Sequence, residues 1–231
     1  MNKLNINYQF SRINGSEESF SFNFDVVKKG LKKISENKAA EWTSLENEKC
    51  PNCPLKIDHC PLAINLVDII EKFDGLNSYE KVHLLISTTE REVSIKTTIQ
   101  KGMSSLMGLA IATSNCPHTS FFAPMAYFHK PLASVYETVF RSVSSYLLSQ
   151  YFLQEEGKDT LFKLDGLTEI YKNLQVINKY IARRLRLITE SDSAVNAIII
   201  LDSYAQALPL MMDSALDEIK EMYAQYYEDV C

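Results

Sequence analysis

Glycine is scarce in this chain, with 7 glycines in 231 residues. A protein built mainly from tight turns needs more of them, because glycine most readily adopts left-handed backbone conformations. Internal repeats and low-complexity tracts are absent as well. The 46% share of hydrophobic residues and the 23% share of charged residues exclude disorder and collagen-like order. We therefore expect a single domain over residues 1–231 in which helix dominates.

An excess of positive charge is also lacking. The 24 Lys and Arg residues stand against 29 Asp and Glu residues, which gives a net charge of −5. This balance gives no electrostatic reason to expect nucleic acid or an anionic membrane as a partner. Wholly apolar runs are short, and the first ten residues alternate polar with apolar side chains instead of forming a signal-peptide core. We expect a cytoplasmic protein that does not span a membrane.

Several catalytic signatures are missing. The sequence contains no G-x-S-x-G, no Walker A loop, no Rossmann glycine fingerprint and no H-E-x-x-H. A zinc deaminase is also disfavoured, because no H-x-E precedes the C-x-x-C pair. These absences lower the expectation of an enzyme without excluding one.

Two pairs of segments alternate with a period of two, which is typical of strands with one buried face. Asn14-Gly15 lies inside the first pair and supplies the turn of a hairpin. The alternating apolar residues are Leu4, Ile6, Tyr8 and Phe10, then Phe20, Phe22 and Phe24, and later Val82, Leu84 and Ile86 with Val93 and Ile95. We expect one small antiparallel sheet of about four strands.

The apolar period changes to 3.6 residues after the second pair. Helical stripes run over 99–111, from Pro131 to 147, over 167–185 and over 195–201. Pro209 is expected to break or kink the last of these before a final amphipathic helix over 212–223. The fold class is therefore α+β, with the sheet packed on a bundle of about five or six helices. Residues 1–97 would hold the sheet and a cysteine-rich metal loop, and residues 98–231 the helical half.

The cysteines carry the strongest chemical signal. Proline directly follows four of the five, namely Cys50, Cys53, Cys60 and Cys116. The two-residue spacer of Cys50-Pro-Asn-Cys53 lets both thiolates reach one tetrahedral ion, and proline restricts the loop. Cys60 is expected just before a helix that begins at Pro61, where the helix dipole favours thiolate. The fifth cysteine, Cys231, is expected to be a free thiol.

The expected ligand set is therefore Cys50, Cys53, Cys60 and Cys116, with His118 and His59 as reserves for the fourth position. Four thiolates suit zinc, which we favour, and equally form the ligand set of an iron–sulfur cluster. The spacing matches neither a zinc ribbon nor a bacterial ferredoxin run. In the alternative reading these are separate buried cysteines acting as small hydrophobic residues, which leaves the prolines unexplained.

The segments CPNCPL, HCPLAINL, SNCPHTSFFAPMAYFHKP, YETVFRSVSSYLLSQYF, NKYIARRL and NAIIILDSYA together resemble an uncharacterised bacterial family, a domain of unknown function. The resemblance covers nearly the whole chain. It implies that the cysteine motifs and the helical half belong to one unit, and it implies no activity.

A few polar residues deserve separate interpretations. His129 is expected to cap or pack at a helix start, or alternatively to act as a general base. Glu137 and Arg141, four residues apart, are typical of a surface ion pair. Asn178 and Asp202 fall on apolar stripes, so they predict either a buried polar network involving Arg183 or Arg184, or a ligand pocket.

Three functional hypotheses follow. The first is a metal-binding protein with a regulatory, sensing or scaffold role. The second is an enzyme with a polar pocket among the helices, built from His129, Glu137, Arg141 or Asp202, with the metal only as a structural staple. The third is a module that binds a protein partner or a second copy of itself through an exposed apolar patch.

Overall fold

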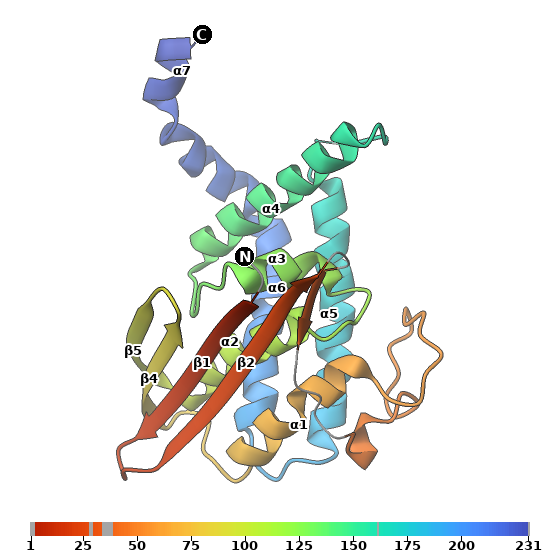
Figure 1. Cartoon of the computed structure of the whole chain (residues 1–231), viewed down its shortest axis with the longest axis vertical. Helices are drawn as coiled ribbons and strands as arrows, with labels where there is room; N and C mark the ends of the chain where they lie inside the picture. The colour runs from red at the N-terminus through yellow and green to blue at the C-terminus, as the bar shows by residue number, and fades with distance from the viewer. Residues whose placement is uncertain (1–2, 28–29, 34–38, 161, 231) are drawn as a thin grey trace.

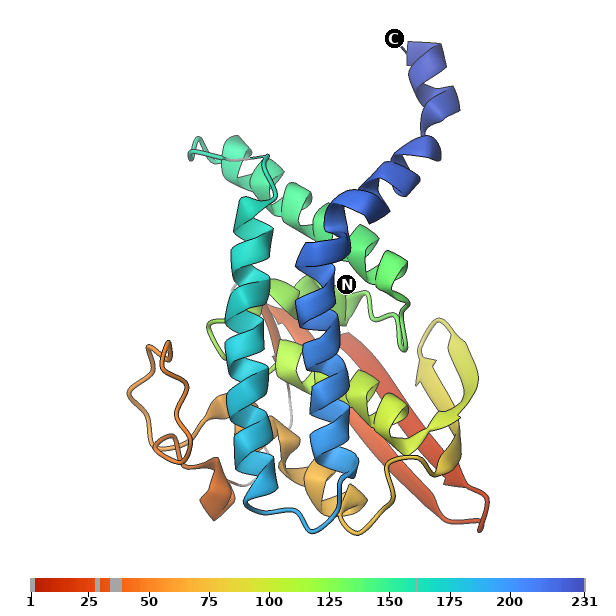
Figure 2. The same cartoon turned by 180° about the vertical axis from the view of Figure 1, so that it is seen from behind.

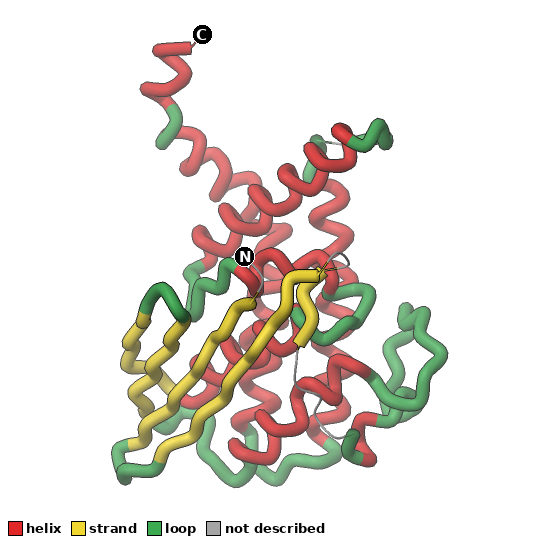
Figure 3. Tube along the Cα trace, viewed as in Figure 1, coloured by secondary structure: helices red, strands yellow, loops and turns green. Residues whose placement is uncertain are grey.

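The computed structural model describes residues 3–27, 30–33, 39–160 and 162–230. Its strands are β1 (Lys3–Arg12), β2 (Glu17–Val27), β3 (Gly30–Lys33), β4 (Lys81–Thr88) and β5 (Glu92–Thr98). Its α-helices are α1 (Pro61–Phe73), α2 (Ile99–Ala112), α3 (Ala123–Tyr127), α4 (Val135–Glu155), α5 (Asp165–Arg186), α6 (Ser193–Glu221) and α7 (Ala224–Val230). Two short 3₁₀ helices, η1 (Glu41–Thr43) and η2 (Ser120–Phe122), lie in the connections. The α+β prediction is confirmed, as Figure 3 shows by colour.

The sheet is antiparallel, with the strand order β3-β2-β1-β4-β5. Tyr8 in β1 pairs with Phe20 in β2 on one side and with Ile86 in β4 on the other, so alternate apolar residues share one face. That face is buried, whereas polar residues such as Asn7 and Gln9 occupy the other face. All four predicted strands are present, and β3 adds a short fifth strand beside β2.

Helices cover only the apolar face of the sheet. In Figure 1 the sheet lies in front of α1 and α2, and the view from behind in Figure 2 shows α5 and α6 side by side on the outer side of these helices. One hydrophobic cluster joins strand residues to residues of α1, α2, α5 and α6, and a second cluster lies among η2, α4, α5 and α6. The sheet and the helices therefore share a continuous core.

Two proline predictions need correction or refinement. Pro131 does not begin a helix: it lies in the turn before α4, which begins at Val135 behind the capping box of Ser134 and Glu137. Reciprocal hydrogen bonds at Ser134 satisfy more of the first-turn backbone donors than a proline start does. Pro209 does not end its helix, because α6 continues through it to Glu221. Figure 2 shows that α6 changes direction in its second half, as a proline inside a helix favours.

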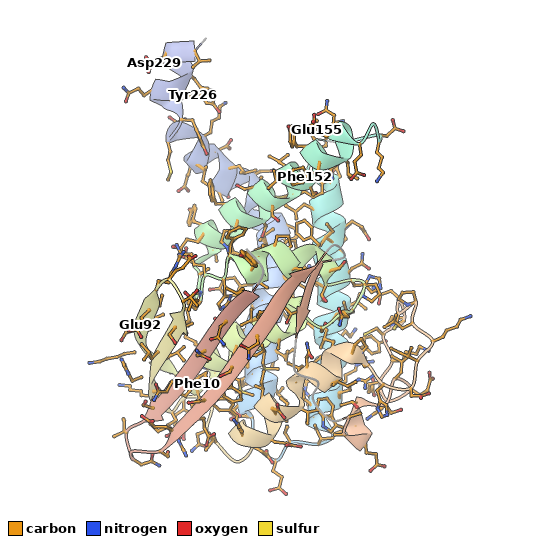
Figure 4. The ribbon with its side chains drawn as sticks, in the orientation of Figure 1. Phe10, Glu92, Phe152, Glu155, Tyr226 and Asp229 are labelled. Carbon is orange, nitrogen blue, oxygen red and sulfur yellow. The ribbon has the colours of Figure 1, made fainter. Side chains whose placement is uncertain are left out.

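The second half of α6, α7 and the end of α4 project beyond the sheet. Figure 4 places Tyr226 and Asp229 at the tip of this projection and Phe152 and Glu155 at the free end of α4. None of the described residues of α7 is buried. By length and apolarity alone, α6 is a candidate membrane span, and the core helices of soluble proteins can pass the same test. In this structure Ala197, Ile198 and Ala205 of α6 are buried within the protein.

Gly102 sets how closely α2 approaches the sheet. A Cβ atom at Gly102 would come within 2.7 Å of Cε1 of Phe10, whose ring is fully buried against Phe20 and Phe73. The ring centroids of Phe20 and Phe73 lie 6.0 and 4.9 Å from that of Phe10, so these rings would have to move with it. Glycine at this position is therefore a requirement of the packing between helix and sheet.

We expect Gly102→Ala to lower the free energy of unfolding by about 1–3 kcal/mol, because overpacking a closed core forces its neighbours apart. Gly108→Ala, in the same helix, is the matched control: its Cβ would lie 3.4 Å from Leu201 Cδ2, which is an ordinary contact. Alanine is the better helix former by about 1 kcal/mol, so this control should be neutral or stabilising. Urea unfolding of both variants measures the difference, and equal effects would contradict the packing argument.

His129 links the loop before α4 to the sheet. Its Nε2 atom forms a short hydrogen bond with the hydroxyl of Tyr8 in β1, and that hydroxyl also lies 2.9 Å from Ser105 Oγ in α2. Burial and, to a smaller extent, the nearby Arg141 cation lower the pKa of His129 to about 3. His129 is therefore neutral in the folded protein at neutral pH.

Acid should destabilise the fold through this histidine. The unfolded chain takes up a proton at His129 near pH 6.5, whereas the folded chain does so only near pH 3, so stability is fully present above pH 6.5 and falls below it. Between pH 6.5 and 5 the native protein should lose about 1–2 kcal/mol more than the His129→Gln variant in urea titrations. His83→Gln is the control, because His83 in β4 is exposed on the polar face of the sheet. Parallel losses in all three proteins would refute the assignment.

Candidate metal centre

Four cysteines from three separate segments line one small hollow of about 20 Å³. Cys50 and Cys53 come from the loop after η1, Cys60 comes directly before α1, and Cys116 follows α2. The four thiols are free and half-buried. The structure thus brings together the four residues that the Cys-Pro pattern singles out, although 55 residues lie between Cys60 and Cys116.

The loop that carries Cys50 and Cys53 is a tight turn. The backbone N–H of Cys53 donates to the carbonyl of Cys50 at 3.0 Å, which turns both side chains to the same side of the loop. Between them, Asn52 anchors the loop to α5, because its side-chain amide donates to Asn173 at 2.8 Å. The two-residue spacer therefore has the geometry expected of a chelating pair.

Cys60 occupies the predicted position before a helix. It is the N-cap residue of α1, with Pro61 as the first helical residue. Its backbone N–H donates to the carbonyl of Thr43 at 2.8 Å, and Ser44 forms an isolated bridge with His59. Cys60 therefore lies at the positive end of the α1 dipole, as the sequence predicts.

Cys116 reaches the hollow because the chain turns sharply after α2. Asn115 adopts a left-handed backbone conformation with φ of 61°, which asparagine tolerates better than most residues. Thr119 then holds the loop, since its hydroxyl donates to the carbonyls of Ile111 at 3.0 Å and Cys116 at 3.2 Å. Burial raises the pKa of the Cys116 thiol, and hydrogen bonds from the backbone amides of His118 and Thr119 oppose part of that rise.

Arg184 places a positive charge beside the thiols. Its side chain is 2% exposed and lines the hollow together with Ile177 and Ile181 of the same helix. It donates to three backbone carbonyls, those of Trp42, Ser44 and Leu45, at 3.1, 2.6 and 3.2 Å. Its Nε atom has no hydrogen-bond partner, and no carboxylate pairs with it within the described ranges.

Burial and, after it, the three neighbouring cysteines raise the pKa of Cys50 to about 12, while Arg184 opposes the shift. As a free thiol, Cys50 is therefore a poor nucleophile. Burial also raises the pKa of Cys116. In the described part of the chain, no three His, Cys, Asp or Glu side chains already stand so that they could hold a metal ion. Ligation therefore requires the thiols to turn toward a common centre.

Both reserve histidines form hydrogen bonds with other groups in this structure. His118 lines the hollow, but its Nε2 atom lies 2.7 Å from the carbonyl oxygen of Asn52 and so joins the two cysteine loops. His59 uses Nδ1 for a hydrogen bond of 2.9 Å with Thr43 Oγ1. Both rings hold backbone segments in place around the thiols.

A second and larger cavity, of about 440 Å³, lies among α2, α3, α4, α5 and α6. His129, Arg141 and Asn178 line it, whereas Glu137 and Asp202 do not. The predicted pair of Glu137 with Arg141 is wrong: Glu137 pairs with Lys130, and Arg141 donates to the carbonyls of Met125 and Phe128. At the start of α4, Lys130 lies within ion-pair distance of Glu137, so Glu137 does not need Arg141 one helical turn further on.

The predicted polar network of Asn178 and Asp202 with Arg183 or Arg184 is also wrong. Arg184 points to the cysteine hollow, Arg183 lies over the Tyr180 ring and near Glu48, and Asp202 accepts from Gln206 at 2.5 Å. The role of Arg184 escaped the sequence analysis. Its signal was present, because Ile177, Ile181 and Arg184 follow the spacing of one helix face.

Comparison with known proteins gives a family and nothing more specific. No curated protein and no solved structure matches this chain. The family model described as "Domain of unknown function (DUF6901)" matches residues 6–224, which include every strand but the first residues of β1, all four half-buried cysteines and the helices through α6. The chain therefore belongs to the DUF6901 family, a domain of unknown function.

Proposed function

We propose that this protein is a metal-binding protein in which Cys50, Cys53, Cys60 and Cys116 hold one zinc ion. The observation that carries the proposal is the meeting of four thiols from three segments at a single hollow beside a buried arginine. Thiolates are the ligands that closed zinc sites prefer, and they occur on short spacers such as the one between Cys50 and Cys53.

The charge of Arg184 supports this ligand set. A guanidinium taken out of water is costly unless negative charge or hydrogen bonds compensate it. Carbonyl groups accept its Nη donors, but they bring no negative charge. Four thiolates around Zn²⁺ carry a net charge of −2, and a site of that charge would supply the missing counter-charge.

The size of the hollow favours a single ion over an iron–sulfur cluster. About 20 Å³ holds one body of the size of a water molecule. A cluster with several iron and sulfide atoms would need the surrounding side chains, Leu45, Leu62 and Ile181 among them, to move apart. Zinc requires only a rotation of the thiols.

A structural, scaffold role fits this site better than catalysis at the metal. Four protein ligands fill a tetrahedral zinc ion and leave no position for substrate. The site would join the loop after η1, the start of α1 and the loop after α2, which are segments with few regular hydrogen bonds of their own. The metal would therefore fix the end of the core that lies away from the projecting helices.

Removing one ligand should release the metal and weaken the fold. We expect about one zinc per chain in protein purified without oxygen, with no visible absorption, and far less in Cys116→Ser. The variant should lose about 3–4 kcal/mol of stability, because an ion bound tightly to the folded state alone stabilises by roughly that amount. Elemental analysis, visible spectra and thermal unfolding measure the three quantities.

The control for this experiment is Cys231→Ser, which should change neither metal content nor melting temperature. Cys231 lies outside the described residues. If the purified protein is brown and contains iron, the zinc assignment is wrong and the four cysteines hold an iron–sulfur cluster instead. Full metal content and an unchanged melting temperature in Cys116→Ser would refute the four-cysteine site.

Arg184 should influence the metal through its charge. We expect Arg184→Gln to weaken zinc binding at least tenfold in competition with a chelator, because Coulomb's law at an effective dielectric constant near 20 gives roughly 4–8 kcal/mol for one positive charge about 4–8 Å from a dianionic site, and a tenfold change needs only about 1.4 kcal/mol. The glutamine retains donors for some of the three carbonyls. Arg184→Met removes the donors as well, so it should also destabilise the metal-free protein.

Arg183→Met is the matched control on the adjacent residue. Arg183 is part-exposed and lies 3.7 Å from Glu48, so its loss should change zinc affinity little. If Arg184→Gln and Arg184→Met lower stability while zinc affinity stays at the native value, Arg184 only ties α5 to the loop, and the charge argument is wrong.

A further inference from the structure

The larger cavity is separate from the cysteine hollow, because no residue lines both. Its volume of about 440 Å³ is in the range of small-molecule sites in proteins. The walls are mainly apolar and include Leu109, Phe122, Leu174 and Leu201. A cavity of this size and character would exclude a strongly polar molecule and accept one with an apolar body.

Asn178 is a polar side chain without a partner in this apolar wall. It is 1% exposed, and neither its amide nitrogen nor its amide oxygen has a hydrogen-bond partner in the structure. Leaving both halves of a buried amide unpaired costs several kcal/mol, and a leucine of similar size would avoid that cost. A hydrogen-bonding group delivered into the cavity by a ligand would satisfy the amide.

The charged residues of the cavity are all basic. Lys101, Lys130 and Arg141 line it, and no Asp or Glu is among its lining residues within the described part of the chain. Lys130 is engaged by Glu137, but Lys101 and Arg141 form no ion pair with a described residue. The cavity is therefore lined by two cations from different elements, α2 and α4, that have no ion-pair partner among the described residues.

We propose that this cavity binds an amphipathic carboxylic acid, whose apolar chain fills the space among the helices. The carboxylate lies near Lys101 and Arg141, because a charged acceptor near two cations makes the strongest hydrogen bonds available in the cavity. Asn178 pairs with a water molecule that the bound ligand holds in the cavity. The proposal is independent of the zinc site.

The test uses decanoate, with decanamide and decylamine as probes of the same chain length and different charge. Binding is measured by calorimetry and by the shift of the melting temperature. Decanoate should bind at least tenfold tighter than decanamide, and decylamine should bind most weakly. Equal affinity for decanoate and decanamide, or failure of decanoate to bind, would overturn the proposal.

Lys101→Met tests the charge without disturbing the core, because Lys101 is exposed and has no described ion-pair partner. It should weaken decanoate several-fold and leave decanamide unchanged. Lys179→Met, on the exposed side of α5, is the matched control and should leave both affinities at their native values. An unchanged preference for decanoate in Lys101→Met would contradict the assignment of the carboxylate.

Asn178→Leu separates a ligand-binding role from a structural one. Without ligand it should raise the melting temperature, because it removes an unpaired buried amide. It should also reduce the additional stabilisation that decanoate gives. A lower melting temperature without ligand, or an undiminished response to decanoate, would show that Asn178 serves the fold and not the cavity.

Discussion

The close contact between α2 and the sheet is the constraint on which the rest of the molecule depends. Gly102 lets the helix axis come near the ring of Phe10, and this fixes where the whole of α2 lies on the apolar face. The same helix then contributes Ser105 to the Tyr8 and His129 network, Gly108 to the larger cavity and, through its C-terminal turn, the position of Cys116. A shift of this helix would displace all three features together.

Two polar side chains of α5, Arg184 and Asn178, are buried, and they differ in how far hydrogen bonds offset the free-energy cost of burial. Arg184 compensates most of the cost of desolvating its charge with three carbonyl groups of the loop after η1, which otherwise would need water. Asn178 sits 6 positions earlier and has no such partner. Within two turns, α5 therefore buries one amide without hydrogen bonds and one charge without a counter-charge among the described residues. Apolar residues would pack there at a lower cost in free energy. Such exceptions are expected where residues serve binding as well as folding.

The sequence predicted those features whose signal is local. Alternation around Tyr8 and Phe22 identified the strands, and Pro61 after Cys60 marked the start of α1, because each pattern depends on the backbone geometry of a few adjacent residues. Pro131 failed as a helix start because Ser134 and Glu137 form a better cap three residues later. The sequence suggested a pocket among the helices only as an alternative and named the lining residues in part, since the walls come from five helices whose crossing positions depend on the packed core.

The projecting end of the chain has a different consequence. Since α7 has no buried residue, its backbone hydrogen bonds can open without disturbing the core. Amide hydrogens in α7 would then exchange with solvent far faster than those in α2, and a protease could remove the tip while the sheet and both hollows stay folded. The match to the family model ends at residue 224, where α7 begins. The segment expected to exchange its amide hydrogens fast therefore begins where the domain described by the family model ends.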